Sequence, residues 1–338
     1  MTDNLLVAID DGYAQIKVFG DNPDGGAPVR HVFRTSVRSG RRGLTTMEGK
    51  STGSYHVAEG EDFTVSEEVA GENTQFDGFH TSPMNRALVY HGLSSAGYDG
   101  RDVGLITGLP VADYFVGEGT NDAKIEAKRA NLLAGISRGV GSSDPMPVVR
   151  GVDVGCQAVA AWFDHVFDDN LELRADAAQS IAIVDIGGRT TDVAVVVGGR
   201  QIDHAQSGTE NIGVLDVYKA LRDLVRKEFD ISDEIPLATL DKAVRNRTIR
   251  LWGDERPIDE LVTKALADIE GKIRREVQRR IGSAAALGAV VVVGGGGALF
   301  QSVSQNFRNG KLTEDPEFAN ARGLWKVSRL RAARDKAA

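Results

Sequence analysis

The chain has 338 residues, of which 41% are hydrophobic and 26% are charged, and its formal net charge is −8. This length is enough for two domains, the composition is typical of a soluble globular protein, and the acidic balance argues against strong direct binding to DNA, whose protein partners are generally basic. The sequence contains no run of about 18 apolar residues, so it predicts no membrane-spanning helix. The single cysteine, Cys156, excludes an intrachain disulfide, and the amino terminus lacks the basic flank of a signal peptide. We therefore expect a cytoplasmic protein that has no contact with membranes.

The first half of the chain opens with three apolar runs that predict strands separated by tight turns. The next region, about 36–100, is rich in Gly, Ser and Thr and has weak periodicity, and we interpret it as a smaller inserted subdomain. Regular periodicity then returns and predicts, in order, a strand at 103–108, a helix at 122–133, a strand at 148–154 and a helix at 158–166.

The second half repeats this plan after a linker at 168–178. Two apolar runs flank a glycine turn, and a buried strand at 289–293 breaks on four glycines at 294–297. The helices predicted in this half are at 214–229, at 258–281, from 298 onward, and from 317 to about 331.

An aspartate–glycine turn occurs at the same place in both halves. Residues 7–12 read VAIDDG and residues 183–188 read IVDIGG, so each strand ends in an aspartate, Asp10 or Asp185, with a glycine two residues later. Glycines let the backbone turn several N–H groups toward a phosphate, and an aspartate there would ligate a cation on that phosphate. For either turn alone, an ordinary hairpin is the alternative. The repetition predicts two pseudo-symmetric α/β domains with a cleft between them.

Three ordered motifs at this spacing resemble the actin-like ATPase fold, which actins, bacterial actin homologues, heat-shock chaperone ATPases and sugar kinases share. Residues 10–17 resemble its first phosphate loop, 185–192 its second phosphate loop, 291–298 its adenosine loop and 148–162 its first connecting segment. The resemblance implies a nucleotide cleft between two α/β domains. We expect the first domain at 1–170, completed by a C-terminal helix at about 317–338, and the second at 171–316, with its own smaller subdomain at about 216–282.

Two segments favour one branch of this superfamily. Residues 7–17 and 107–115 resemble the ParM/StbA plasmid-segregation actins. That resemblance implies an ATPase that binds ATP, or alternatively GTP, with Mg²⁺ and hydrolyses it slowly within a homopolymer filament. It also implies that the filament moves plasmid DNA through an adaptor protein on a centromere-like site. Two residues depart from the pattern: Tyr13 replaces a small hydroxyl residue, and Arg189 replaces a threonine.

The resemblance also implies which residues hold the nucleotide. Asp10 and Asp185 would hold the hydrated Mg²⁺, one from each domain. Gly213 would border the ribose, and Glu270 and Lys272 would reach the sugar or base, although a solvated helix face explains those two charges almost as well. The remaining candidates are Asp11, Gly12, Tyr13, Ala14, Lys17, Gly187, Gly188, Arg189 and Thr190 around the phosphates, and Gly295 and Gly296 under the adenine and ribose.

Gln157 occupies the position in the connecting segment where this fold places a residue that orients the attacking water. A neutral amide orients water without being a strong base, which implies slow hydrolysis. Asp153 is the alternative, because a carboxylate can act as a base. A helix cap is the alternative role for Gln157, and a solvated surface position is the alternative for Lys17. The six histidines and Cys156 show no metal-ligand spacing.

Two other functions remain open at this stage. A small-molecule kinase of the same fold would need a catalytic carboxylate and an acceptor pocket, and no sugar-kinase signature is present. A membrane-associated bacterial shape or division actin would need an amphipathic helix, for which residues 324–330 are the candidate. The apolar positions of that segment suit a helix packed on the first domain better.

Overall fold

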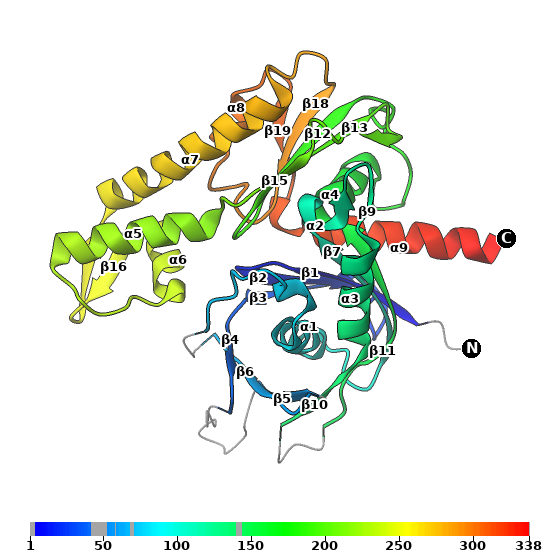
Figure 1. Cartoon of the computed structure of the whole chain (residues 1–338), viewed down its shortest axis with the longest axis horizontal. Helices are drawn as coiled ribbons and strands as arrows, with labels where there is room; N and C mark the ends of the chain where they lie inside the picture. The colour runs from blue at the N-terminus through cyan, green and yellow to red at the C-terminus, as the bar shows by residue number, and fades with distance from the viewer. Residues whose placement is uncertain (1–3, 42–52, 58, 68–70, 140–143, 338) are drawn as a thin grey trace.

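The computed structural model describes residues 4–41, 53–57, 59–67, 71–139 and 144–337. The amino-terminal residues 1–3, residues 42–52 of the predicted inserted subdomain and the last residue of the predicted C-terminal helix lie outside these ranges. Two α/β halves lie on either side of a central pair of helices (Figure 1). Within the ranges given, no helix is long and apolar enough to cross a membrane.

The first large sheet comes from the amino-terminal half and has the strand order β11-β7-β1-β2-β3. An antiparallel meander supplies three of its strands, and two parallel strands extend it on the other side of β1. Asp10 lies directly opposite Lys17 in this register, so both side chains are on one face of the sheet. The strands are β1 (Leu5–Asp11), β2 (Gln15–Gly20), β3 (Val29–Arg34), β7 (Asp102–Leu109) and β11 (Val148–Cys156).

The second large sheet repeats this topology, with the order β14-β13-β12-β18-β19 and β15 paired to β13. β12 is antiparallel to β13 and parallel to β18, as β1 is to β2 and β7. The predicted α/β architecture with two similar halves is therefore confirmed, and Asp10 and Asp185 lie on matching strands. The strands are β12 (Ile181–Ile186), β13 (Thr191–Val197), β14 (Gln201–Ile202), β15 (Gly208–Glu210), β18 (Ala289–Val293) and β19 (Gly310–Leu312).

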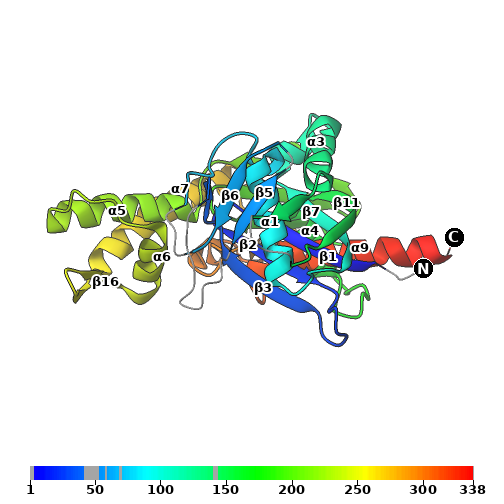
Figure 2. The ribbon, with the colours of Figure 1, turned by 90° about the horizontal axis from the view of Figure 1, so that it is seen from below.

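A small subdomain extends from each half. In the first, β10 joins β5, β6 and β4 in a four-stranded sheet next to α1, so the chain on both sides of β7 contributes, beyond the predicted 36–100 segment (Figure 1). Figure 2 shows β5 and β6 of this sheet beside α1. In the second, α5 packs on both α6 and α7, and α6 packs on a short hairpin (Figure 1). The elements are β4 (Val37–Ser39), β5 (Ser54–Val57), β6 (Asp62–Val65), α1 (Pro83–Ser95), α3 (Asp122–Leu133) and β10 (Ile136–Arg138), then α5 (Val214–Phe229), α6 (Leu237–Asn246), β16 (Thr248–Leu251), β17 (Asp254–Pro257) and α7 (Asp259–Ile281).

The glycine block does not lead into a helix at residue 298, so that prediction is wrong. Residues 295–301 form turns, and α8 (Ser302–Gln305) begins only afterwards. Two features cause this difference: Gly294 has a left-handed φ of 87°, and the N–H of Gly296 donates to the carbonyl of Ile186 in the neighbouring strand. The remaining short elements are η1 (Phe79–Thr81), α2 (Val111–Tyr114), β8 (Phe115–Val116), β9 (Gly119–Thr120) and η2 (Pro316–Phe318).

Two central helices are exchanged between the sheets. α4 (Gln157–Val166) follows the first sheet but packs on β12 and β13, whereas α9 (Ala319–Ala337) follows the second sheet but packs on β1, β2 and β7. The helices contact each other at Gly323, where a Cβ would lie 1.8 Å from the carbonyl oxygen of Ala160. Leu324 and Trp325 are buried in this packing, which argues against the use of that segment as a membrane anchor.

Candidate functional site

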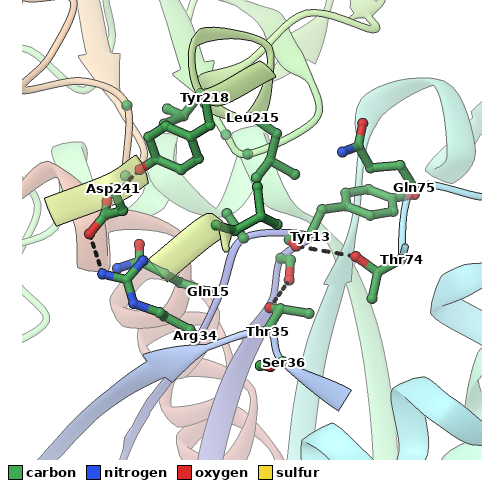
Figure 3. A pocket seen from close by; sticks show the side chains of 18 of the residues that line it. Tyr13, Gln15, Arg34, Thr35, Ser36, Thr74, Gln75, Leu215, Tyr218 and Asp241 are labelled. Atoms are coloured by element: carbon green, nitrogen blue, oxygen red, sulfur yellow. Dashed lines mark hydrogen bonds and ion pairs between the residues drawn. The ribbon is translucent and has the colours of Figure 1, made fainter. Parts of the chain in front are cut away.

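A cavity of about 700 Å³ lies between the two halves. Its walls are formed by both aspartate–glycine turns, the glycine block and the starts of α4, α5 and α9. Figure 3 shows Tyr13 and Gln15 on one side and Leu215 and Tyr218 of α5 on the other. The volume is in the usual range for small-molecule sites.

The first carboxylate of the cavity is Asp10, at the end of β1. Its Oδ2 lies 3.2 Å from Nζ of Lys17, and its Oδ1 accepts a hydrogen bond of 2.9 Å from Nε2 of Gln157. Burial alone would lower the pKa of Lys17, but the carboxylates of Asp10 and Glu317 raise it above its usual value. Lys17 is 6% exposed, so the alternative of a solvated surface lysine is wrong, and the cavity holds a fixed cation beside a fixed carboxylate.

The second carboxylate is Asp185, at the matching end of β12. Its Oδ2 accepts a hydrogen bond of 2.8 Å from Asn320, whereas its buried Oδ1 has no hydrogen-bond partner among the described residues. Burial, reinforced by the nearby charges of Asp192 and Asp10, raises the pKa of Asp185 to about 7. Such an oxygen suits a cation supplied by a ligand, because a cation would remove both the missing contact and the electrostatic cost.

The two aspartates fit Mg²⁺ better than a metal held by protein alone. Mg²⁺ commonly takes one or two carboxylates together with phosphate oxygens and several waters. The structure, in the residues that it describes, contains no group of three or more His, Cys, Asp or Glu side chains able to hold a metal. Asp10 and Asp185 line the same cavity from opposite halves, so a cation carried by a phosphate ligand would have one carboxylate on each side.

The glycine turns meet across the cavity at positions where a side chain would not fit. A Cβ on Gly188 would lie 2.6 Å from Cβ of Ala14, so the two turns are in direct contact. A Cβ on Gly213 would lie 2.4 Å from the carbonyl oxygen of Gly188, and one on Gly296 would lie 2.7 Å from Cγ2 of Ile186. These approaches leave peptide groups, rather than side chains, along the floor of the cavity.

Gln157 and Asp153 are placed very differently. Gln157 is the first residue of α4, lines the cavity and is 6% exposed, and its side chain bonds to Asp10 instead of capping the helix. The absence of a Cβ on Gly108 makes room for it, since that atom would lie 2.5 Å from Cγ of Gln157. The Asp153 side chain is 53% exposed, lies 3.6 Å from Arg331 and is outside the cavity wall. The geometry favours Gln157 for any role at the cavity.

Comparison with known proteins agrees with this architecture. Residues 183–305 match the family model described as "Archaeal actin homologue MreB-like, C-terminal", and residues 8–129 match "Actin like proteins N terminal domain". A ParM subunit in a 15-stranded filament from Clostridium botulinum superposes with a TM-score of 0.75 at 18% identity, covering 97% of this chain and 100% of that one. The chain is a protein of the actin-like fold. No curated protein matches it by sequence.

Two further solved structures support the actin-like fold over nearly the whole chain. An archaeal actin homologue in complex with ADP has a TM-score of 0.74 at 20% identity, covering 96% of this chain and 99% of that one. Alp7A, an actin-like protein, has a TM-score of 0.71 at 14% identity, covering 99% of this chain and 98% of that one.

Asp11 does not contribute its side chain to the cavity of this actin-like protein. The carboxylate is fully buried on the other side of β1, where it bonds to Lys128 at 2.8 Å and to Thr107 and Asn85 at 2.7 Å. Burial alone would raise the pKa of Asp11, but Lys128 and His80 hold it below its usual value. Asp11 therefore fixes the end of β1 from behind, and the prediction that it contacts a nucleotide has no support from its position.

Tyr13 and Arg189, the two residues that depart from the ParM/StbA pattern, face each other across the cleft. The Arg189 guanidinium lies 5.1 Å from the centroid of the Tyr13 ring, and its Nη1 is 3.4 Å from the phenol oxygen. Its Nη2 is 3.3 Å from Asp77 in the first half. Burial raises the pKa of Tyr13 to about 12, so the phenol stays neutral at physiological pH. Tyr13 and Thr190 line the cavity, whereas Arg189 contacts Tyr13 from outside the cavity wall.

Glu270 and Lys272 of α7 are not brought to the cavity. Glu270 accepts a hydrogen bond of 2.5 Å from Ser302, and Lys272 pairs with Asp268 at 2.9 Å on the exposed face of the helix. The cavity is instead lined by apolar side chains that sequence reasoning missed, namely Leu215, Tyr218, Ile235, Leu240 and Leu299.

Other contributors were also missed, and they differ in whether a sequence signal exists. Gln15 lies two residues from Lys17 on β2 and therefore on the same face, which strand periodicity could have shown. Two threonines stabilise the first turn: the hydroxyl of Thr35 donates to the carbonyl of Gly12 at 2.6 Å, and that of Thr74 to the carbonyl of Tyr13 at 3.3 Å (Figure 3). No local signal marks either threonine.

An ion pair crosses the cavity between the two halves. Arg34 at the end of β3 reaches Asp241 of α6, 207 residues later in the chain (Figure 3). Asp241 also accepts hydrogen bonds from the hydroxyl of Tyr218 and, at 3.2 Å, from Nε of Arg245. Arg34 thus makes a direct contact between the first half and the small subdomain of the second.

Proposed function

We propose that this chain is a nucleotide-dependent, filament-forming ATPase that segregates plasmid DNA through an adaptor protein. The proposal rests on one observation: two aspartate–glycine turns meet across one cavity. Each turn follows the corresponding strand of its half, β1 in the first and β12 in the second. Such a pair suits a polyphosphate with its cation, because peptide N–H groups and carboxylates are presented from both sides.

In the proposed complex, the chain binds ATP, or alternatively GTP, between its halves. Backbone N–H groups of residues 12–14 and 187–189 would hold the β- and γ-phosphates, and Lys17 would supply a compact positive charge. Asp10 and Asp185 would hold Mg²⁺, which neutralises charge on the transferred phosphate when it is bound. Gly295 and Gly296 would pass beneath the base and ribose, and Gly213 would border the ribose.

Hydrolysis would be slow because the proposed water-orienting group is an amide. Nε2 of Gln157 is occupied by Asp10, which leaves the amide oxygen to accept a hydrogen bond from water. An amide oxygen aligns a water but does not take its proton at neutral pH, so it contributes mainly positioning. The ATPase would therefore act as a timer for the stability of a filament.

The proposals of filament formation and plasmid segregation are supported by the structural neighbours. A ParM from Clostridium botulinum and Alp12 are both known as filaments. We propose that this chain also assembles with copies of itself in the cytoplasm. Its net charge of −8 suits indirect engagement of DNA through a basic adaptor on a centromere-like site. For the domains we propose 1–170 with about 317–338, and 171–316.

The proposal is tested with pure protein, light scattering and electron microscopy. Mg-ATP should produce filaments, and phosphate release should follow assembly. Asp185→Ala should remain folded and lose most hydrolysis, because one of the two carboxylates proposed to hold Mg²⁺ is absent. Normal hydrolysis by that variant would remove the mechanism, and the lack of any nucleotide-dependent polymer across salt and temperature would remove the filament function.

The plasmid role needs its own test. A plasmid that carries the coding sequence with the Asp185→Ala change should be lost from growing cells faster than the unaltered plasmid. Equal retention of the two plasmids would argue against segregation while leaving the ATPase intact.

A further inference from the structure

Two amide side chains occupy matching positions over the two aspartates. Gln157 opens α4, the helix after the last strand of the first sheet, and its Nε2 donates to Asp10 at 2.9 Å. Asn320 is the second residue of α9, the helix after the last strand of the second sheet, and its Nδ2 donates to Asp185 at 2.8 Å. Both amides are buried and line the cavity. The internal repeat therefore includes an amide as well as a carboxylate.

The second pair has two polar atoms without partners. Oδ1 of Asn320 and Oδ1 of Asp185 are both buried, and neither makes a hydrogen bond to any other described part of the chain. An unsatisfied buried polar atom typically costs about 1–3 kcal/mol, so two in one contact call for an explanation. Both atoms are acceptors when Asp185 is ionised, and both belong to residues of the cavity wall. A cation and its waters would satisfy both at once.

We propose that Asn320 is a positioning residue for the metal of a bound metal–nucleotide complex. Its amide nitrogen holds one oxygen of Asp185 so that the other faces the cation, and its own oxygen accepts a hydrogen bond from a water on that cation. Mg²⁺ suits this role because it keeps several of its waters in protein sites. This assignment rests on the proposed function, since it requires a metal–nucleotide complex in the cavity.

The test separates metal-dependent from metal-independent binding of ADP. The variants are Asn320→Leu, which keeps the branched shape and the number of side-chain heavy atoms but removes the polar atoms, and the smaller Asn320→Ala. Affinity for ADP is measured with Mg²⁺ and with a chelator. We expect the gain in affinity due to Mg²⁺ to fall by about 10–100-fold, the usual effect of removing a partner of a metal ligand. Affinity in chelator should not change, and Mn²⁺ bound to the ADP complex, counted by electron paramagnetic resonance, should fall in parallel.

Asn306→Ala is the matched control. Asn306 is an exposed asparagine of the same half, and its amide donates to the backbone oxygen of Ser302. It should keep the wild-type response to Mg²⁺.

The outcomes distinguish this inference from the proposed function. If wild-type protein gains no ADP affinity from Mg²⁺, the proposed function itself fails. If it does gain affinity and Asn320→Leu gains the same amount, the inference is overturned. Equal losses with metal and with chelator, or loss of all binding in both variants, would assign Asn320 a purely structural role and would overturn it as well.

Discussion

The ion pair between Arg34 and Asp241 provides a direct test of how the two halves control access to the cavity. We predict that Arg34→Ala shifts the cleft toward an open state and speeds the release of bound nucleotide. Arg34 belongs to the first large sheet and Asp241 to the small subdomain of the second half, so the pair must separate when the halves move apart.

The size of the effect follows from the surroundings of the pair. The Asp241 side chain is 4% exposed and that of Arg34 is 25% exposed, so solvent screens the contact only in part. In Arg34→Ala, the Asp241 carboxylate still accepts hydrogen bonds from Tyr218 and Arg245. The cost of about 3–5 kcal/mol for leaving a buried charge unpaired therefore does not apply. A hydrogen bond to a charged group contributes about 2 kcal/mol, which corresponds to roughly a 30-fold change in the equilibrium between closed and open clefts.

The assay is the dissociation rate of a fluorescent ADP analogue, followed after mixing with excess unlabelled ADP. Arg34→Ala should release the analogue up to about 30-fold faster than wild type. Arg245→Ala is the matched control, because it removes a guanidinium from the same carboxylate but within one helix, four residues away. Release by Arg34→Ala within twofold of wild type, or an equal acceleration by Arg245→Ala, would refute the reasoning.

Two further predictions concern the carboxylate and amide sides of the cavity. Asp185 has a pKa of about 7 in the folded protein against an ordinary 3.8, so the native state holds a proton that the unfolded state releases; the stability of ligand-free protein should therefore fall as the pH rises between those values. Thermal unfolding across pH should show this fall for wild type and lack it for Asp185→Asn, and identical pH trends would contradict the shift. Gly108→Ala places a methyl group 2.5 Å from Cγ of Gln157 and should lower ATP turnover roughly 100-fold by misplacing the amide, with ADP affinity little changed. Gly151→Ala on the adjacent strand, where a Cβ would meet no atom within 4 Å, is its control, and equal turnover by the two variants would count against Gln157.

Local signals were sufficient to predict the core of the fold and the two aspartates at the ends of β1 and β12. Asp10 and Asp185 stand where apolar strands end on glycine turns, and the same pattern occurs twice, so sequence alone indicated matching positions. The repeat would also have indicated Asn320, had it been followed to the helix start that corresponds to Gln157. The prediction for Asp11 neglected a local rule: consecutive residues of a strand point to opposite faces of the sheet. Because Asp10 faces the cavity, the Asp11 side chain must face away from it.

Other features depend on contacts that no local pattern encodes. Arg34 and Asp241 meet only because β3 and α6 are brought together by the closing of the two halves. The helical periodicity of residues 258–281 predicted α7 but could not show that its exposed face, with Lys272, turns away from the cavity. The turns after Gly294 likewise reflect a bond to a neighbouring strand instead of local helix propensity.

The exchange of α4 and α9 has a consequence for how the molecule can be divided. A cut in the linker at 168–178 would leave the first sheet without Leu324 and Trp325, and the second sheet without Trp162 of α4. Each fragment would then expose a broad apolar sheet and aggregate when made alone, whereas the two fragments made together would cover each other. In assembly terms, the monomer is equivalent to a domain-swapped dimer whose two copies are joined in one chain.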